Sequence, residues 1–384
     1  MVVRKSVAAA ALVAFLPGIL HAQKKKPASD DEGYIPVVAP ENKSKKDKDT
    51  TQTLPPPKDL PGAVVADTDR LTFEVTPLSG KGLFTPQTRE ALKTLLRSNR
   101  GTIVKLRAFV AGSGDLRRVS ELVAETFAEK HQPLPALSVV QVGGLLLAGA
   151  QVVIESTETA KRSVNPNGVA FLSGQSAASV GQSLEQLKNA LEKAGMGTDD
   201  TLRVTCFVSS LEEQRDARQR MEATFPGAAL NLVQMQREPV TPAAECEAVA
   251  RLRTAPKESL NFLNPAGIEK SPNYSQMALV NSPRLVLTGT QLAFGNQESD
   301  ATLAFRRLEK VLGSMNARFD GVVMSHIYVT SSAMMAQVRK VKAGYYNVKN
   351  PPAATMLPFE GLPSLDAAFG VDLVAVPSPS SAQR

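Results

Sequence analysis

The same order of expected elements occurs three times along this chain, and this repetition limits the possible folds more than any other feature. In the middle of the chain, "GVAFLSGQ" has the pattern of a strand, and the following segment places Leu184, Leu187 and Leu191 at helical spacing. "DTLRVTCFVSS" alternates as a strand, "LEEQRDARQRMEATF" is helical, and "AALNLVQMQ" and "ECEAVARL" are two more strands. Such a unit of about ninety residues has the size of one compact domain.

The C-terminal and N-terminal parts of the chain have the same order. The C-terminal copy runs from "PRLVLTGTQLA" through two helical segments to "ATMLPFEGL" and "FGVDLVAV", and the N-terminal copy runs from "RLTFEVTP" to "AQVVIES". We expect α+β units over residues 62–160, 161–255 and 264–378. Because a sheet with one apolar face must cover that face, the three units should pack against one another.

The N-terminus has the pattern of an export signal. Arg4 and Lys5 precede the apolar run "SVAAAALVAFLPGIL", and "LHAQ" offers Ala22 as a cleavage position, which predicts a signal peptide over residues 1–22. The alternative is an uncleaved N-terminal anchor, although the run is short for a membrane span. Residues 23–61 combine charge runs with prolines and predict a disordered tether. We therefore expect an exported protein, periplasmic or extracellular, with no membrane span after cleavage.

Charge and composition argue against several other classes of protein. The net charge of +7 falls to +5 without the signal, several of the lysines lie in the tether among acidic residues, and aromatic residues make up only 5% of the chain. These features disfavour nucleic acid as a partner. Outside the signal, only His131 and His326 remain, without metal-ligand spacing, so no metal or cofactor is expected. Cys206 and Cys246 either form a disulfide or remain two buried thiols on separate strands.

Three stretches make a family resemblance specific. "SPNYSQMALVNSPRLVLTGTQLA" carries Tyr-Ser-Gln, "GVAFLSGQSA" carries Ser-Gly-Gln, and "PPAATMLPFEGLPSLDAAFGVDLVAV" resembles a closing strand pair joined by a Leu-Pro turn. Together they resemble the Rid family, also called YjgF or L-PSP endoribonuclease, the reactive intermediate deaminases. The resemblance implies a chorismate mutase-like, ferredoxin-type α+β sandwich. Since family members form homotrimers with clefts between subunits, it also implies that three linked repeats form an intrachain pseudo-trimer.

The resemblance also implies which residues form a site. Deaminating members use an arginine to hold the substrate carboxylate and a glutamate to position water, and at the arginine position this chain has Ala354, Leu230 and Leu137. Glu155 and Glu247 match the glutamate, whereas Val374 replaces it in the last unit. These two glutamates are the candidate catalytic residues, with strand-end carboxylates facing solvent as the alternative reading. The candidate ligand-binding residues are Tyr274, Gln175, Gln291 and Thr355.

Two functions follow from this pattern. With all three arginines absent, the first is a binding protein that holds a small metabolite in clefts between the repeats. The second is a deaminase-type hydrolase of 2-iminobutanoate or 2-iminopropanoate that uses Glu155 or Glu247, with an arginine donated from elsewhere, such as Arg237 or Arg251. An RNA-acting protein is a third reading, which the few aromatic residues and the export signal disfavour.

Overall fold

The computed structural model describes residues 59–98, 101–112, 115–212, 216–237, 243–268 and 270–378. The expected signal peptide lies outside these residues, as does the expected tether apart from residues 59–61. All described residues belong to one compact unit of the chain. None of the helices in this described part is long and apolar enough to cross a membrane.

The first sheet is formed by the N-terminal part of the chain and has the strand order β2-β6-β3-β4. Strands β3 and β4 are parallel, and the other neighbours are antiparallel. The elements are β2 (Leu71–Val75), α1 (Phe84–Ser98), β3 (Gly101–Ala111), α2 (Leu116–Glu129), β4 (Ala136–Val142) and β6 (Val152–Ala160). The last strand of the unit therefore lies between its first and second strands.

The middle and C-terminal parts repeat this connectivity. The middle sheet contains the order β7-β10-β8-β9, and the C-terminal sheet contains β13-β17-β15-β16, again with only the second and third strands parallel. The middle elements are β7 (Val169–Ala177), α3 (Val180–Lys193), β8 (Thr201–Val208), α4 (Ala217–Thr224), β9 (Ala229–Gln234) and β10 (Ala244–Arg251). The C-terminal elements are β13 (Arg284–Thr288), β14 (Gln291–Phe294), α5 (Glu298–Ser314), β15 (Ala317–Val329), α6 (Ser332–Lys342), β16 (Ala353–Pro358) and β17 (Ala367–Pro377).

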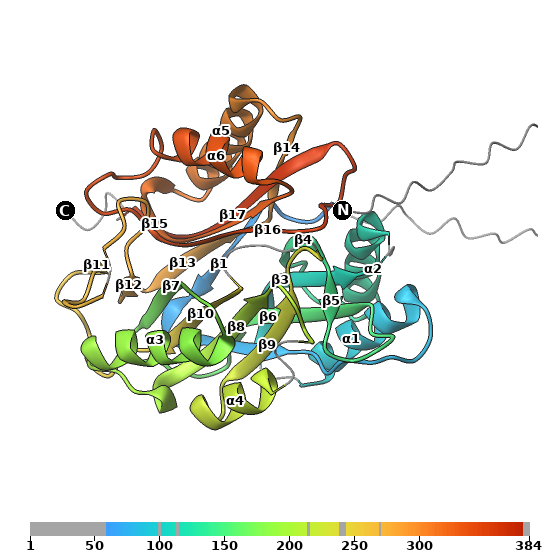
Figure 1. Ribbon diagram of the computed structural model, residues 1–384, viewed down its shortest axis with the longest axis horizontal. Helices are drawn as coiled ribbons and strands as arrows, with labels where there is room; N and C mark the ends of the chain where they lie inside the picture. Colours follow the sequence, from blue (N-terminus) through green and yellow to red (C-terminus); the bar gives the residue numbers. More distant parts are fainter. Residues whose placement is uncertain are drawn as a thin grey trace, which may run out of the picture. The chain divides into compact units, whose positions relative to one another are not determined.

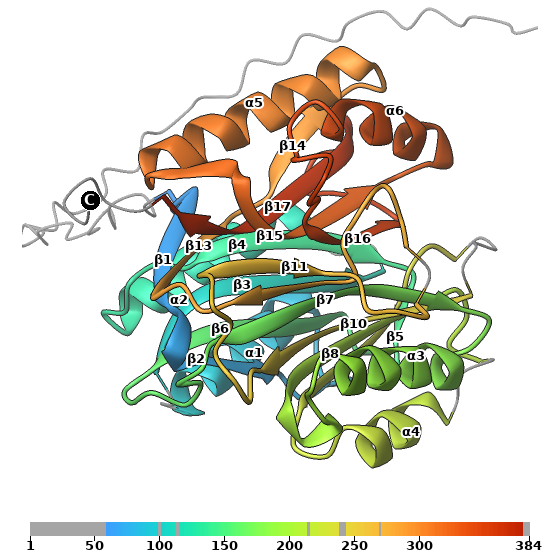
Figure 2. The same cartoon turned by 90° about the vertical axis from the view of Figure 1, so that its left-hand side faces the viewer.

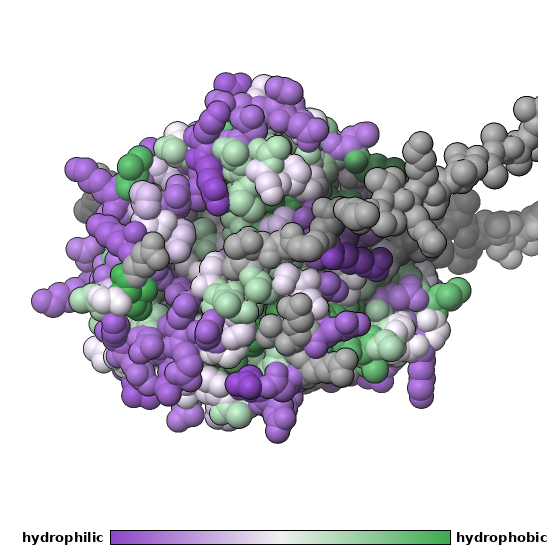
Figure 3. Space-filling model, in the orientation of Figure 1, coloured by the Kyte–Doolittle hydropathy of each residue, from purple (hydrophilic) through white to green (hydrophobic). Residues whose placement is uncertain are grey.

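The helices lie on the outside and the sheets meet in the interior (Figures 1 and 2). In α3, Leu184, Leu187 and Leu191 are buried against the sheet, as their spacing predicts, and the Ser179 hydroxyl caps the helix by accepting from the N–H of Gln182. On the face shown in Figure 3, hydrophilic residues predominate and apolar residues form small separate patches. Most of the large apolar side chains are buried between the elements.

Two strands, β1 and β12, pair with a different sheet from the one that follows them in the chain. Strand β1 (Ala63–Asp67) precedes the first unit but pairs with β13 of the C-terminal sheet. Strand β12 (Met277–Val280) lies within the bounds expected for the C-terminal unit, 264–378, but pairs with β7 of the middle sheet and carries β11 (Leu260–Leu263) on its other side. These pairings satisfy backbone groups at sheet edges that would otherwise stay exposed, and they tie the units together.

The short strand β5 (Gly144–Leu145) similarly extends the middle sheet from the first unit. Within the middle sheet, Cys206 on β8 and Cys246 on β10 are directly opposite each other and form a disulfide. Of the two possibilities for these cysteines, the structure has the bridged one.

Candidate functional site

The strand registers place three sets of polar side chains at equivalent positions. In each unit, one residue of the second strand faces a carboxylate on the last strand and a hydroxyl or amide side chain on the third strand. The sets are Arg107, Glu155 and Ser138; Thr205, Glu247 and Asn231; and His326, Asp372 and Thr355. The second strand of each unit carries one of Arg107, Thr205 and His326, and the other six side chains lie on the two strands that flank it.

The register corrects one expectation about the C-terminal unit. Val374, which the sequence comparison placed at the glutamate position, pairs with Met324, whereas Asp372 pairs with His326. The acidic position is therefore retained in all three units, with Asp372, two residues before Val374 on β17, in the third. The three residues expected at the arginine position occupy mutually equivalent places beside the second strands: Leu137, Leu230 and Ala354.

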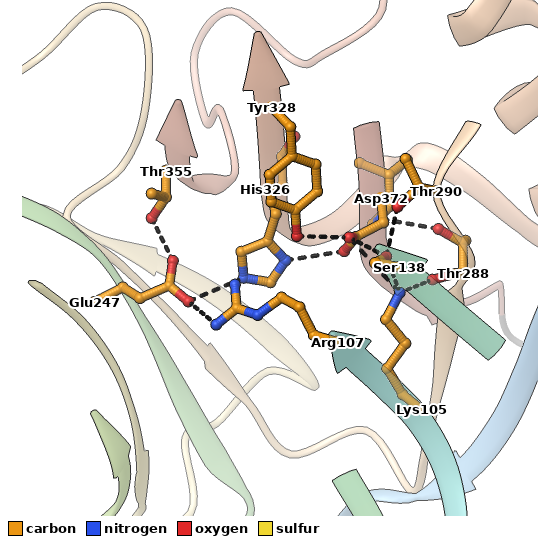
Figure 4. Close-up of polar contacts among 12 residues, drawn as sticks. Lys105, Arg107, Ser138, Glu247, Thr288, Thr290, His326, Tyr328, Thr355 and Asp372 are labelled. Carbon is orange, nitrogen blue, oxygen red and sulfur yellow. Dashed lines mark hydrogen bonds and ion pairs between the residues drawn. The ribbon is translucent and has the colours of Figure 1, made fainter. Parts of the chain in front are cut away.

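The three sets come together in one buried network (Figure 4). Arg107 is its centre: Nε donates to Oε2 of Glu155 at 2.8 Å, and Nη2 donates to Oε1 of Glu247 at 2.7 Å. The other oxygen of Glu247 accepts from the Thr355 hydroxyl at 2.5 Å, and Thr205 and Asn231 both donate to Oε1 of Glu155 at 2.7 Å. One arginine of the first unit thus connects carboxylates of two units, and the second carboxylate continues to the third.

Asp372 organises the other end of the network. Its Oδ2 accepts from the Ser138 hydroxyl at 2.5 Å and from the Tyr328 hydroxyl at 2.9 Å, and its Oδ1 lies 2.9 Å from Nδ1 of His326. Lys105 reaches the same region, donating to Ser138 at 2.6 Å and to the carbonyl of Thr288, with Nζ 3.6 Å from Asp372. Since a carboxylate can only accept, Nδ1 of His326 carries a proton.

The network lowers the pKa of its carboxylates. Burial raises the pKa of Glu155 and of Glu247, but the nearby cations, Arg107 foremost, together with the hydrogen bonds to the carboxylates outweigh burial and lower it. Both side chains are 1% exposed, so they are not solvent-facing strand ends. A general base near neutral pH needs a raised pKa, and neither glutamate meets that requirement.

A different glutamate does have a raised pKa. Glu245, two residues before Glu247 on β10, is buried, and burial raises its pKa to about 7 despite the hydrogen bond from the Ser176 hydroxyl. Ser176 faces it on β7, and Gly174 lies against its carboxyl group. The register places Val153 and Gly370 at the equivalent positions of the other two units, so only the middle unit has an acid there.

Glu245 lines a cavity of about 170 Å³ between the middle and C-terminal units. Tyr274 and Ala354 line the same cavity, which brings the Tyr-Ser-Gln motif beside the position of the absent arginine. Arg339 and Lys342 on α6 line it as well. Burial, and then Arg339, lowers the pKa of Lys342 to about 8, and its Nζ donates to the carbonyl of Asn273 at 3.1 Å.

The other arginine positions also line cavities between units. Leu230 lines one with Val153, Asn231 and Arg218, and Leu137 lines another with Thr290, Gln291 and Arg117. Each cavity combines the third strand of one unit with elements of a different unit. Because the lining side chains differ, the three clefts are chemically unequal, and only the Ala354 cleft has a buried carboxyl beside two cationic side chains.

The residues predicted to bind a ligand are therefore distributed over separate places. Tyr274 lines the Ala354 cleft and Gln291 lines the Leu137 cleft. Gln175 is buried and its Nε2 donates to the carbonyl of Ser173 and to Oε1 of Gln276, while Thr355 belongs to the central network. The structure does not bring these four into one site.

Neither arginine suggested as a substitute enters the Ala354 cleft. Arg237 donates through Nε to the carbonyl of Gly143 at 2.9 Å, and Arg251 is exposed at the end of β10. The cations that do line the cleft, Arg339 and Lys342, were missed because they lie on a helix rather than on the expected strand. Their three-residue spacing, which places both on one helix face, was the available signal.

The comparison with protein families gives a match in the C-terminal unit. Residues 267–377 match the Endoribonuclease L-PSP family model. No match was found among the curated proteins. Solved structures similar to this chain include NMB1025 of the YjgF family from Neisseria meningitidis, with 14% identity and a TM-score of 0.24, covering 32% of this chain and 97% of that one.

Two further similar structures have comparable coverage. The Rid-family protein YyfB from Yersinia pestis has 20% identity and a TM-score of 0.27, and Rv2704 of the YjgF/YER057c/UK114 family from Mycobacterium tuberculosis has 23% identity and a TM-score of 0.23. Each covers 31% of this chain and 99% of the other. The family model thus identifies residues 267–377, the C-terminal unit, as a Rid-family (YjgF, L-PSP) unit within this chain.

Proposed function

We propose that this protein is an exported, three-unit Rid protein that binds a small carboxylate-bearing metabolite in the cleft between its middle and C-terminal units. The single observation that carries the proposal is the placement of Arg339 and Lys342 in the cleft that also contains Ala354. Family members hold a substrate carboxylate with an arginine at the Ala354 position. Here two cations from α6 supply the positive charge that this position lacks.

The chemistry of the cleft supports a small anionic ligand. Both cations contact uncharged partners, because Nη2 of Arg339 contacts Sδ of Met335 and Nζ of Lys342 donates to the carbonyl of Asn273. The cavity of about 170 Å³ is smaller than the ~300–1,000 Å³ of sites for drug-sized molecules. The Glu245 carboxyl and the Tyr274 side chain add polar groups that can orient a second polar end of the ligand.

The test is a calorimetric titration of residues 23–384 with 2-oxobutanoate and with 2-aminobutanoate, two stable compounds of this size class. Binding should occur and should weaken at least tenfold in Lys342→Met and in Arg339→Gln. Lys340→Gln is the matched control, because Lys340 is an exposed cation on the same helix. Equal affinity in all variants would place the ligand elsewhere and contradict the proposal.

A second candidate function is hydrolysis of an imine, and the raised pKa of Glu245 favours it. Near neutral pH, Glu245 can take a proton from water as the water oxygen bonds to the imine carbon, and can pass that proton to the nitrogen, which gives a carbinolamine. It can then move the hydroxyl proton to the amino nitrogen in the same way, as the carbon–nitrogen bond breaks and the carbonyl forms. The products are ammonia and a 2-oxo acid. Turnover of 2-iminobutanoate that disappears in Glu245→Gln would establish this activity, whereas absence of turnover in the parent protein would leave the binding function.

Export is part of the proposal and rests on the N-terminal sequence. The disulfide between Cys206 and Cys246 supports it, because disulfides persist mainly in oxidising compartments. Sequencing the N-terminus of the protein recovered from the producing cell tests cleavage after Ala22. A mature protein that begins at Met1 would contradict the cleaved signal.

A further inference from the structure

A small cavity lies inside the buried network, apart from the three clefts. It has a volume of about 30 Å³ and is lined on one side by apolar residues, among them Phe73, Phe171 and Leu287. Its polar lining includes Lys105, Arg107, Arg203 and His326. A space of this size can hold a water molecule or a monatomic ion, but not a metabolite.

The polar atoms without a partner around this cavity are all nitrogen atoms. Among the described residues at this cavity, three buried nitrogen atoms have no hydrogen-bond partner: Nη1 of Arg107, Nε of Arg203 and Nε2 of His326. Their residues are only 3%, 6% and 6% exposed, so water outside the protein does not reach these atoms. Nε2 of His326 lies 3.3 Å from Oε1 of Glu247, but not in hydrogen-bond geometry. Arg203 lies 3.5 and 3.7 Å from carboxylates and 5.3 Å from the centre of the Phe73 ring.

The carboxylates beside the cavity are already satisfied. Both oxygens of Glu155 accept hydrogen bonds, Oε2 from Arg107 and Oε1 from Thr205 and Asn231. Both oxygens of Asp372 accept as well, from His326 and from Ser138 and Tyr328. The groups without a partner at the cavity are therefore two guanidinium N–H groups and Nε2 of His326, which donates when His326 is protonated, so a guest that only accepts hydrogen bonds fits them.

The charges of the network also favour an anionic guest. Lys105, Arg107 and Arg203 balance the three carboxylates Glu155, Glu247 and Asp372. Burial lowers the pKa of His326, but Glu247 and Asp372 outweigh it and raise the pKa above its ordinary value. When His326 is protonated, its Nε2 becomes a donor and one positive charge is left without a counter-charge.

We propose that this cavity binds a single chloride ion, held by Nη1 of Arg107, Nε of Arg203 and Nε2 of His326. A chloride ion accepts from all three donors and supplies the missing negative charge, and its remaining surface is matched by the apolar wall. A water molecule has two lone pairs, so it would accept from at most two of the three donors, and it would supply no charge. Since Arg107, Arg203 and His326 come one from each unit, the ion joins all three units at their common centre.

The direct test is a crystal of residues 23–384 grown in sodium bromide, with diffraction data collected at the bromine absorption edge. An anomalous peak in the cavity, in contact with the three nitrogen atoms, is expected. A cavity that contains only non-anomalous density would overturn the proposal, because it would show that water fills the site. This measurement uses the unaltered protein and so does not depend on the folding of a variant.

The solution test compares thermal unfolding in sodium chloride and in sodium gluconate at equal ionic strength. Because a ligand that binds only the folded state raises Tm saturably, we expect chloride to raise Tm by about 2 °C or more relative to gluconate. Arg203→Gln should remove this difference, and Arg251→Gln, an exposed arginine in the same sheet, should keep it. Equal Tm values in the two salts for the parent protein would overturn the proposal.

Discussion

Gly174 lies directly against the carboxyl group of Glu245: a Cβ atom on Gly174 would stand 2.0 Å from Oε1 of Glu245 and 2.6 Å from its carboxyl carbon. The Ser-Gly-Gln stretch thus has a structural purpose in this chain. It leaves room for the side chain that gives the Ala354 cleft its acid, while Ser176 on the same strand donates to the other oxygen. The motif and the acid belong to one arrangement across β7 and β10.

Gly174→Ala should therefore displace Glu245 from the cleft. Overpacking of a buried site costs typically about 1–3 kcal/mol, so a lower free energy of unfolding is expected together with loss of ligand binding. Gly313→Ala is the matched control, because Gly313 lies in α5 with open space around its Cβ position, and alanine there should stabilise by about 0.5–1 kcal/mol. Urea unfolding of both variants measures this, and an unchanged midpoint for Gly174→Ala would contradict the close packing.

The protonation of Glu245 predicts a specific dependence of stability on pH. Its folded pKa of about 7 lies above its ordinary value of 4.5, so between these values the folded state binds more protons than the unfolded state. Stability then falls as pH rises from about 4.5 to 7, by roughly 3 kcal/mol in total. Glu245→Gln removes this loss and should be more stable than the parent at pH 8 but not at pH 4. Parallel stability curves for the two proteins would reject the raised pKa.

For the carboxylates of the central network, stability changes with pH in the opposite direction. The folded pKa of Asp372, Glu155 and Glu247 is lowered, so their contribution to stability is complete above the ordinary values of 3.8 and 4.5 and is lost as pH falls below them. We expect the urea midpoint to decline steeply below about pH 4 and the three units to unfold together. A midpoint that stays constant down to pH 2 would show that the network does not stabilise the fold.

Arg107 is the side chain on which this network depends most. Arg107→Met should leave Glu155 and Glu247 buried without their main partner, which costs about 3–5 kcal/mol when one member of a buried ion pair is removed. Arg97→Met, which removes the exposed pair with Glu90, should have little effect. The measurement is urea unfolding near neutral pH. If both variants lost stability equally, burial of the charges would not be the reason.

Much of the fold could be predicted from the sequence, because each unit shows its own strand and helix periodicity. The pairing of β1 and β12 with a sheet other than the one that follows them could not be predicted, since a short strand has the same local pattern in either sheet. Glu155 and Glu247 were candidates from the sequence, but their burial and their hydrogen-bond partners were not predicted. Those surroundings depend on Arg107, which is distant in sequence from Glu247 and meets it only when the units pack.

Glu245 is a second residue whose properties the local sequence does not reveal. Glu245 and Glu247 point to the same side of β10, and sequence reasoning chose the one that matched the family glutamate. Their pKa values shift in opposite directions because Arg107 reaches only Glu247, while Glu245 faces Ser176 and the cleft. Neither the arginine nor the cleft is visible from the local sequence "AECEAVAR".

The disulfide between Cys206 and Cys246 closes a segment of 40 residues that contains α4 and β9. Closing such a loop restricts the unfolded chain, and bridges of this kind contribute about 2–4 kcal/mol. Unfolding with a reducing agent present should therefore have a lower urea midpoint, and Cys206→Ala with Cys246→Ala should have the same midpoint with or without that agent. A parent protein whose midpoint ignores the reductant, and whose thiols react with a labelling reagent after unfolding alone, would show that the two cysteines are not bridged.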